Sequence, residues 1–591
     1  MAYDHVLSQL GDFGRYQRRI YILLCLPAIS CAFHKLAWVF LGAKAHHRCQ
    51  LPFEEANATY SSLSVSTWNM SLPWDSQLGN YSSCARYDAN FTDDYFQSMQ
   101  PATQTVPCSS WIYDHSKYES SAVMEWNLVC NNAWLRATAD ALFMVGVLLG
   151  SIIFGDLSDR FGRRPIFFAS LVLQLIGGIL AAIAPEYITF VLARMVVGAT
   201  SSGVFLVAYV IALEMVGSKK RLIAGVVCQM FFSVGYMLTA FLAYMIRDWR
   251  YLQLALTLPG VAFMCYWWLI PESARWLLTK NRKEEAIQLL LKVANENKVN
   301  ITAERIQELL DQEEEETPET EKEMKNMESG SPLMNKELTQ NGIDHKNEDP
   351  ESHQDKMLTN GSGTEKKEEP GETGSPSVLD LFRYPNLRKK SLNIFFNWFV
   401  NSATYYGLSW NTSNLGGNDF LNFLISGVVE IPGYVMLLLL LNRWGRKATL
   451  CSALIITGLA LLLTQVVPSN TNWLIITLAM IGKMTITASY GTIYIFTAEQ
   501  FPTVIRNVGL GAASTSARVG GVLAPYFNLL ADYWRPLPLV IFGTLALSAG
   551  SLALLLPETL NKKLPETIQD GEEFGKKAKK MKSPKQSLSD A

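Results

Sequence analysis

Long apolar segments constrain what this chain can fold into more than any other feature of its sequence. A bilayer core of about 30 Å is crossed by roughly 20 helical residues that are apolar on every face, whereas a soluble helix is apolar along one stripe. Twelve segments meet the membrane criterion: 20–43, 134–154, 166–184, 188–213, 222–246, 251–270, 391–410, 420–441, 448–467, 473–497, 507–530 and 537–556. The sequence therefore predicts an all-α membrane protein with twelve transmembrane helices, not a soluble fold.

The first apolar segment follows Arg15, Arg18 and Arg19, as the apolar part of a cleaved signal peptide would. It is longer than a typical signal sequence, however, and it lacks a small-residue cleavage site. We therefore expect a retained helix, with residues 1–19 in the cytoplasm.

Basic loops orient the chain, because Lys and Arg gather on the cytoplasmic side of membrane proteins. With the N-terminus inside, twelve helices place four basic stretches inside: 159–164, 218–221, 442–447 and 576–582. The loops on the other side are poor in Lys and Arg, apart from the nearly balanced stretch 247–250. The tail 557–591 is then cytoplasmic, and the formal net charge of −2 does not suggest a nucleic-acid partner.

Loop 43–133, which this orientation places outside, carries glycosylation sequons and cysteines. The sequons lie at Asn57, Asn69, Asn80 and Asn90. The cysteines are Cys49, Cys84, Cys108 and Cys130, and they predict two disulfides whose pairing stays open. Two further sequons, at Asn300 and Asn360, fall on the inside and are expected to stay unmodified. With no CxxC pair or His cluster, we expect no metal site.

A polar linker separates two sets of six apolar segments. The sequence thus divides into an N-terminal half at 20–270, a cytoplasmic linker at 271–390 and a C-terminal half at 391–556. Stretch 303–376 is rich in Glu, Lys, Asn, Ser and Gly, so it is expected to be a disordered tether. A short amphipathic helix near 282–297 is expected before it.

The two halves carry the same landmarks in the same order. Four features recur at an offset of about 285 residues: Asp159–Arg164 with Asn442–Lys447, Arg194 with Lys483, Glu214 and Arg221 with Glu499 and Arg506, and Pro271-Glu-Ser with Pro557-Glu-Thr. This recurrence predicts a duplicated six-helix unit with both copies in the same orientation. Parallel halves are the architecture of major facilitator transporters, in which the substrate binds between the halves.

Charged residues of these landmarks gather on the cytoplasmic side. We expect them to form networks that hold a cytoplasmic gate in one conformation and break in the other. The expected gate residues are Asp159, Arg160, Arg163, Glu214, Arg221, Arg443, Arg446, Glu499 and Arg506. The alternative interpretation is that these charges only fix topology and anchor helix ends.

Further motifs carry a family resemblance over nearly the whole chain. They are Glu125–Cys130 (EWNLVC), Gly155–Arg164, Pro271–Trp276 (PESARW), Val429–Pro432 (VEIP) and Ala498–Asn507. With them the chain resembles the organic cation, organic anion and carnitine transporters of the major facilitator superfamily. Three stretches look most like the insect organic cation transporters: Ala32–Leu36, Leu408–Thr412 and Asn414–Asn418. The resemblance implies transport of a small organic ion by alternating access, in the plasma membrane.

Ionisable residues inside apolar segments are candidates for the substrate site, because a charge in the bilayer is costly. They are Lys35, Asp140, Arg194, Glu430, Lys483 and Arg518. In the family that the chain resembles, cation transporters carry an acidic residue at the place of Arg518, whereas anion and carnitine transporters carry Arg. A guanidinium there would bind a carboxylate, while Glu430 could bind an ammonium. A zwitterion such as carnitine satisfies both, an organic anion is an alternative, and Arg518 could instead pair internally with Glu430 or a backbone carbonyl.

Aromatic residues at helical spacing could complete this site. Pairs four or seven residues apart share a helix face and could hold an ammonium by cation–π attraction, although helix packing is the competing interpretation. The resemblance implies substrate contacts at Phe205, Tyr209, Gln229, Trp398, Tyr405, Glu430, Lys483, Tyr490 and Arg518, and Lys35 is a further candidate.

Other functional classes find less support in the sequence. A Walker A motif and an HExxH motif are both missing, so we expect neither a primary pump nor an enzyme, and no catalytic residue. The main rival is a transporter-like receptor that binds its ligand without moving it. We expect no cofactor, a small organic ion and lipid as partners, and a monomer. Coupling to Na⁺ or H⁺ and an oligomeric assembly stay open.

Overall fold

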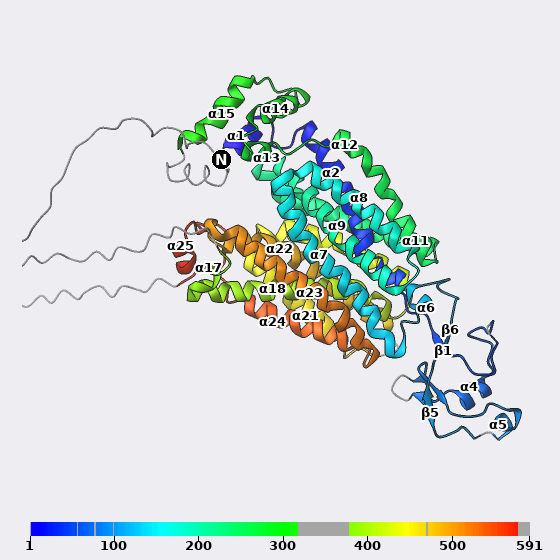
Figure 1. Cartoon of the computed structure of the whole chain (residues 1–591). Helices are drawn as coiled ribbons and strands as arrows, with labels where there is room; N and C mark the ends of the chain where they lie inside the picture. Colours follow the sequence, from blue (N-terminus) through cyan, green and yellow to red (C-terminus); the bar gives the residue numbers. More distant parts are fainter. Residues whose placement is uncertain are drawn as a thin grey trace, which may run out of the picture.

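The computed structural model describes residues 2–55, 57–75, 79–98, 100–316, 377–468 and 471–576. Long helices dominate and form two bundles (Figure 1). Helices α1 (Ala2–Gln9) and α25 (Ile568–Glu573) lie at one end, called here the inner end. The short strands of loop 43–133 lie at the opposite, outer end (Figure 1).

Six membrane segments form each half. Those of the N-terminal half are α2 (Arg15–Leu36) with α3 (Trp38–Leu41), α7 (Ala133–Phe161), α8 (Arg163–Ile183), α9 (Tyr187–Glu214), α10 (Arg221–Met245), and α11 (Trp249–Thr257) continued by η3 (Leu258–Cys265) and α12 (Tyr266–Leu269). Those of the C-terminal half are α18 (Pro385–Trp410), α19 (Asp419–Val428) with α20 (Glu430–Leu441), α21 (Arg446–Leu463), α22 (Asn472–Gln500), α23 (Arg506–Leu529) and α24 (Leu537–Ala553). Each predicted segment coincides with one of these, and the predicted fold class is confirmed.

Length and composition alone single out fewer of them. By these two criteria, nine helices in the described part of the chain are long and apolar enough to cross a membrane. The 17-residue α24 falls short in length. Helices α18 and α23 are long enough but carry polar residues, such as Asn397 and Arg518.

Proline accounts for a break that positions a charged residue. Pro432 has no backbone N–H to offer the carbonyl of Val428, and α19 ends at that residue. Helix α20 then starts at Glu430, so this carboxylate sits at the break between the two helices of the eighth segment.

The two halves meet along two repeat-related seams. Helix α7 of the N-terminal half packs on α23, and α10 packs on α19 and α20. Within the halves, α9 packs on α7 and α8, and its repeat counterpart α22 packs on α20 and α21. The core therefore follows the same plan twice, as the internal repeat predicts.

Short helices cover the inner end. They are α13 (Ala274–Thr279), α14 (Lys283–Asn297), α15 (Ala303–Glu316), α17 (Asp380–Arg383), η2 (Ser218–Lys220) and η5 (Thr503–Ile505). The amphipathic helix expected near 282–297 is α14. The prediction of disorder from residue 303 is wrong for its first part, because α15 is helical and packs on α1 with Ile306 and Leu309 buried. The rest of the expected tether, 317–376, and the basic tail from 577 lie outside the described residues.

The outer loop is a small disulfide-bonded unit. Its strands pair antiparallel as β1 (His47–Cys49) with β6 (Trp111–Tyr113), β2 (Trp74–Asp75) with β3 (Asn80–Tyr81), and β4 (Ala85–Tyr87) with β5 (Thr105–Pro107). The helices are α4 (Val65–Ser71), α5 (Asp93–Gln97), α6 (Ala122–Glu125) and η1 (Cys130–Asn132). The two predicted disulfides are confirmed as Cys49–Cys108 and Cys84–Cys130. All four sequon asparagines are exposed.

Candidate functional site

The centre of the C-terminal half holds a buried ion pair between Glu430 and Lys483. Glu430 begins α20, and Lys483 lies on α22. The Oε1 and Nζ atoms are 3.0 Å apart, and neither side chain is more than 2% exposed. Because a charge buried without a partner is costly, each residue serves as the counterion of the other.

Hydroxyl groups complete the surroundings of this pair. Tyr405 of α18 donates to Glu430 Oε1 at 2.6 Å, and Ser233 of α10 donates to Oε2 at 2.5 Å. Lys483 donates to Ser409 Oγ at 2.6 Å and stands 3.4 Å from the ring centroid of Tyr405. Since Ser233 belongs to the N-terminal half, the Glu430 carboxylate also joins the two halves.

Arg518 of α23 is half-buried and does not join the Glu430–Lys483 pair. Its Nη1 atom donates to Ser514 Oγ, one turn earlier, at 2.7 Å. Within the ranges that the structure describes, no carboxylate lies at ion-pair distance from Arg518. The alternative of an internal pair with Glu430 does not occur, because Lys483 is the counterion of Glu430.

Lys35 of α2 is a second cation without a carboxylate partner among the described residues. Its Nζ donates to the hydroxyl of Tyr406 on α18 at 3.2 Å, a bond between the two halves. The same atom lies 5.4 Å and 5.9 Å from the ring centroids of Tyr406 and Phe232. Lys35 and Arg518 thus offer one positive charge from each half that no described carboxylate neutralises.

The aromatic residues predicted in the C-terminal half come together. Tyr405 stacks on Tyr490 with ring centroids 5.6 Å apart, and Trp398 meets Tyr494 edge to face at 4.4 Å. Trp398 is fully buried, and its Nε1 donates to Thr497 Oγ1 at 2.8 Å. Trp398 is therefore a packing residue in this conformation, whereas Tyr405 contacts the ion pair and Tyr490 stacks on Tyr405.

The N-terminal half contributes a smaller aromatic group. Phe205 stacks on Tyr209 at 6.0 Å and meets Phe232 edge to face at 6.3 Å. Phe232 is also the ring beside Lys35, so it connects this group to the cation. Gln229 is half-buried on the same helix as Phe232, and its carbonyl accepts from Ser233 at 3.5 Å.

Two residues of this site do not stand out in the sequence. Tyr406 is adjacent to the predicted Tyr405, and only the rotation of α18 shows that it faces Lys35. Ser233 is one of many hydroxyl residues in apolar segments, and its role depends on contact with Glu430 of the other half. For Tyr406, the sequence indicates a role only through its position beside the predicted Tyr405.

A second buried ion pair lies in the N-terminal half. Arg194 of α9 and Asp140 of α7, both singled out as intramembrane charges, lie 3.5 Å apart from Nη2 to Oδ1. Their side chains are 3% and 2% exposed. This pair joins the second and fourth segments of its half, as Glu430 and Lys483 join the eighth and tenth.

The predicted gate charges pair within each half rather than across the halves. In the N-terminal half, Arg163 binds Asp159 and lies 3.5 Å from Glu214. Arg221 binds Asp4 of α1 instead of Glu214.

The C-terminal half repeats this plan. Arg446 lies 3.1 Å from Glu499, while Arg506 donates to the Thr503 hydroxyl at 3.1 Å. Arg443 is exposed, as is Arg160 of the first half, which pairs with Asp156 at 2.9 Å. Glu214 therefore pairs with Arg163, and Glu499 pairs with Arg446. Neither glutamate pairs with the arginine that follows it by seven residues.

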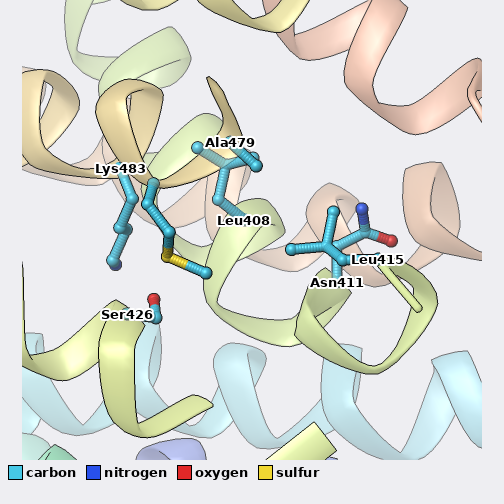
Figure 2. A pocket seen from close by; sticks show the side chains of 7 residues that line it. Leu408, Asn411, Leu415, Ser426, Ala479 and Lys483 are labelled. Carbon is cyan, nitrogen blue, oxygen red and sulfur yellow. The ribbon is translucent and has the colours of Figure 1, made fainter. Parts of the chain in front are cut away.

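A small cavity lies beside Lys483. It is lined by Leu408, Asn411, Leu415, Ser426, Ala479, Met480 and Lys483, from α18, α19, α22 and the 3₁₀ helix η4 (Asn411–Asn414). Figure 2 shows Lys483 and Ser426 on one side of it and Asn411 and Leu415 on the other. Its free space suits about one water molecule, so this cavity does not hold an organic ion.

Comparison with known proteins agrees with this architecture. Residues 108–341 match the Sugar (and other) transporter family, and residues 390–586 match the Major Facilitator Superfamily. The solved structure of the xylose transporter XylE from E. coli, in an inward open conformation, superposes with a TM-score of 0.55 at 15% identity. It covers 94% of this chain and 99% of that one, and it shows the fold alone.

Full-length relatives are more similar in sequence. The Organic cation transporter protein of Drosophila melanogaster is 57% identical over 98% of this chain and 96% of its own. Solute carrier family 22 member 3 of Rattus norvegicus is 33% identical over 97% of this chain and 96% of its own. The Beta-alanine transporter of Drosophila melanogaster is also 33% identical, over 97% of this chain and 89% of its own. The chain is therefore a membrane transporter, not an enzyme, and it belongs to the organic cation transporter and solute carrier family 22 group of the major facilitator superfamily.

Proposed function

We propose that this protein carries a small organic zwitterion, with a carboxylate and an ammonium group as in carnitine, across the plasma membrane by alternating access. One observation carries the proposal. Lys483 neutralises Glu430 inside the protein, whereas Lys35 and Arg518 have no carboxylate partner in the described ranges. A site with unbalanced positive charge favours a substrate that brings a carboxylate and disfavours a simple cation.

The ammonium end of such a substrate also finds suitable surroundings. Tyr405 and Tyr490 stack on each other beside the ion pair, and Tyr406 lies next to Lys35. Aromatic faces attract quaternary ammonium groups without requiring a free carboxylate. In this proposal the positive charges of Lys35 and Arg518 bind the carboxylate of the zwitterion, and the aromatic rings bind its ammonium group.

Contacts between the halves support alternating access. The hydrogen bonds and ion pairs described between the halves lie at the centre and toward the outer end, for example Ser233 with Glu430 and Lys117 with Asp419. The predicted gate charges at the inner end bind partners of their own half. This distribution is expected of a transporter that is closed on its outer side.

The outer loop supports the proposed location. Two disulfides form in an oxidising compartment, and exposed sequons are accessible to glycosylation there. We infer that loop 43–133 is extracellular and glycosylated at Asn57, Asn69, Asn80 and Asn90, and that both termini are cytoplasmic.

Uptake by cells that express the protein tests the substrate class. The probes are labelled carnitine, tetraethylammonium and p-aminohippurate, with surface expression verified. Carnitine should enter best, and Arg518→Gln should reduce its uptake at least about 10-fold, because a charged hydrogen bond to carboxylate is lost. Arg305→Gln removes an exposed guanidinium of α15 and should leave uptake unchanged.

Other outcomes of this assay select other functions. Preferred uptake of tetraethylammonium, insensitive to Arg518→Gln, would support a simple cation carrier, as the name of the Drosophila relative suggests. Preferred uptake of p-aminohippurate would support an organic anion carrier. Binding of a probe at the cell surface without uptake would support a receptor.

A further inference from the structure

The buried pair of the N-terminal half differs from its counterpart in how its polar atoms are satisfied. Asp140 and Arg194 lie on the second and fourth membrane segments, and Glu430 and Lys483 lie on the repeat-related eighth and tenth segments. Both oxygens of Glu430 accept hydrogen bonds from hydroxyl groups. In contrast, Oδ1 of Asp140 and both Nε and Nη2 of Arg194 are buried without a hydrogen-bond partner.

Aromatic rings take the place of these partners. The guanidinium carbon of Arg194 lies 4.9 Å from the ring centroids of both Trp38 and Phe143, and 5.9 Å from that of Phe190. These rings surround the guanidinium and attract it by cation–π interaction. The carboxylate is thus compensated by one cation at 3.5 Å and by no hydrogen bond on Oδ1.

We propose that Asp140 is a proton-binding site that couples transport to the proton gradient. A carboxylate that is buried without donors favours its neutral form, and binding one proton removes its charge without further ligands. A sodium ion does not suit the same place, because it needs several oxygen ligands and would lie against the Arg194 guanidinium. The inference goes beyond the proposed function, and it does not depend on the class of substrate.

Few charged groups face Asp140. Arg194 approaches from α9, and Arg136 lies one turn away on α7 itself. Arg136 donates to the carbonyl of Gly42 at 2.7 Å and also faces Asp532.

The other neighbouring helices add little charge near this carboxylate. His34 of α2 lies beyond Arg194 and feels its charge. Helix α8 carries no titratable residue after Arg164, and α23 presents the uncharged Tyr526 hydroxyl to Thr138 of α7. Two opposing effects therefore act on Asp140: burial favours its neutral form, whereas Arg194 and Arg136 favour the carboxylate.

A short covalent route connects this pair to the proposed substrate site. Trp38, which covers Arg194, begins α3 directly after the junction at Ala37. Lys35 lies at the end of α2, on the other side of that junction. When Asp140 takes up a proton, Arg194 loses its counterion. We infer that the α2–α3 junction transmits this change to Lys35.

Infrared spectroscopy of the purified protein tests the proton site without any substrate. In a titration from about pH 8 to about pH 5.5, a carbonyl band of a protonated carboxylic acid should appear. The band should be absent from Asp140→Asn and shifted in Asp140→Glu. Asp93→Asn, which changes an exposed carboxylate of α5, should leave it in place. A band that persists in Asp140→Asn would overturn the site.

Transport measurements test the coupling. Substrate addition should acidify the cytosol of cells loaded with a pH-sensitive dye, with carnitine as probe, or with tetraethylammonium where uptake selects it. Outside acidification should raise wild-type uptake several-fold. Asp140→Asn, at equal surface expression, should lose both effects but retain exchange of internal for external substrate. Unchanged acidification by Asp140→Asn, or none by wild type, would overturn the coupling even if the infrared band is present.

Discussion

Single charged residues in this protein depend on their partners more than on their position. Glu430 and Lys483 are almost completely enclosed, so each is tolerable only while the other is present. The same residues are the first candidates for substrate contact from the sequence. Because they pair with each other, Lys35 and Arg518 are the candidates whose charge no carboxylate of the described residues neutralises.

Removal of one member of this pair should lower the stability of the folded protein more than removal of both members. Lys483→Met leaves the Glu430 carboxylate without a counterion and should reduce stability by about 3–5 kcal/mol. The double variant Lys483→Met with Glu430→Gln buries no net charge and should recover most of that loss. Thermal unfolding of detergent-purified protein measures both. A double variant as unstable as the single one would show that the pair is not a mutual counterion.

The sequence predicts which charged residues lie in the membrane, but it does not predict how they pair. The cost of membrane charge identified six ionisable candidates, since that cost depends only on segment and residue type. It did not single out Arg136 of α7, which lies one turn from Asp140. Pairing could not be predicted, because it depends on helix rotation and on the break before Glu430. Arg221 and Glu214 illustrate this: their seven-residue spacing suggests one face, but Arg221 turns to Asp4 of α1.

At the scale of elements, the repeated PES and PET motifs are helix caps. Glu272 accepts from the backbone N–H groups of Arg163 and Arg164, which begin α8. Glu558 does the same for Arg446 and Lys447 at the start of α21, at 3.0 Å each. Gly162 and Gly445 precede these helices with φ of 111° and 92°, a conformation that favours glycine. The repeat therefore conserves a way of starting a helix at the inner end.

These two caps should respond oppositely to pH. Burial alone would raise the pKa of Glu558, but backbone N–H donors outweigh it and lower that pKa. Burial dominates at Glu272 and raises its pKa. A lowered pKa adds stability that is lost as pH falls through the folded-state pKa, whereas a raised pKa adds stability that is lost as pH rises.

Melting temperatures of Glu558→Gln and Glu272→Gln across a pH series check this difference. The difference in melting temperature between wild type and Glu558→Gln should widen as pH rises. It should then correspond to about 0.5–2 kcal/mol in the free energy of unfolding, the cost of a lost cap. The difference in melting temperature between wild type and Glu272→Gln should narrow as pH rises over the same range. Glu566→Gln, an exposed neighbour of the second cap, should show neither trend. Equal pH slopes for the two caps would contradict the assignment.

Elements themselves were largely predictable. All twelve membrane segments were predicted as apolar runs, because a helix satisfies the backbone of such a run in lipid. In the described part of the chain, α18, α23 and α24 nevertheless fall short of strict length and composition criteria. The error at α15 arose from composition: its many glutamates suggested disorder, but Ile306 and Leu309 form a buried face against α1. A few apolar residues at helical spacing outweighed the average of the stretch.

For the whole molecule, the contacts at the outer end decide which way the transporter faces. Lys117 of the outer loop binds Asp419 at 2.6 Å, and Lys44 binds Asp532. Both pairs join an N-terminal residue to the C-terminal half. The disulfide-bonded loop thus contributes to the contact between the two halves at the outer end.

A reversible bridge at the second of these pairs tests alternating access directly. Lys44 and Asp532 are 34% and 41% exposed, so cysteines at both places would be accessible to a short bis-methanethiosulfonate reagent. The bridge should hold the outer end closed and abolish uptake, and a mild reductant should restore it. Each single cysteine variant, treated in the same way, should keep its uptake and thereby control for other cysteines such as Cys265. Full uptake by protein whose bridge is complete by mass spectrometry would mean that the outer ends of α2 and α23 need not separate, and a rocking motion of the two halves would then be wrong.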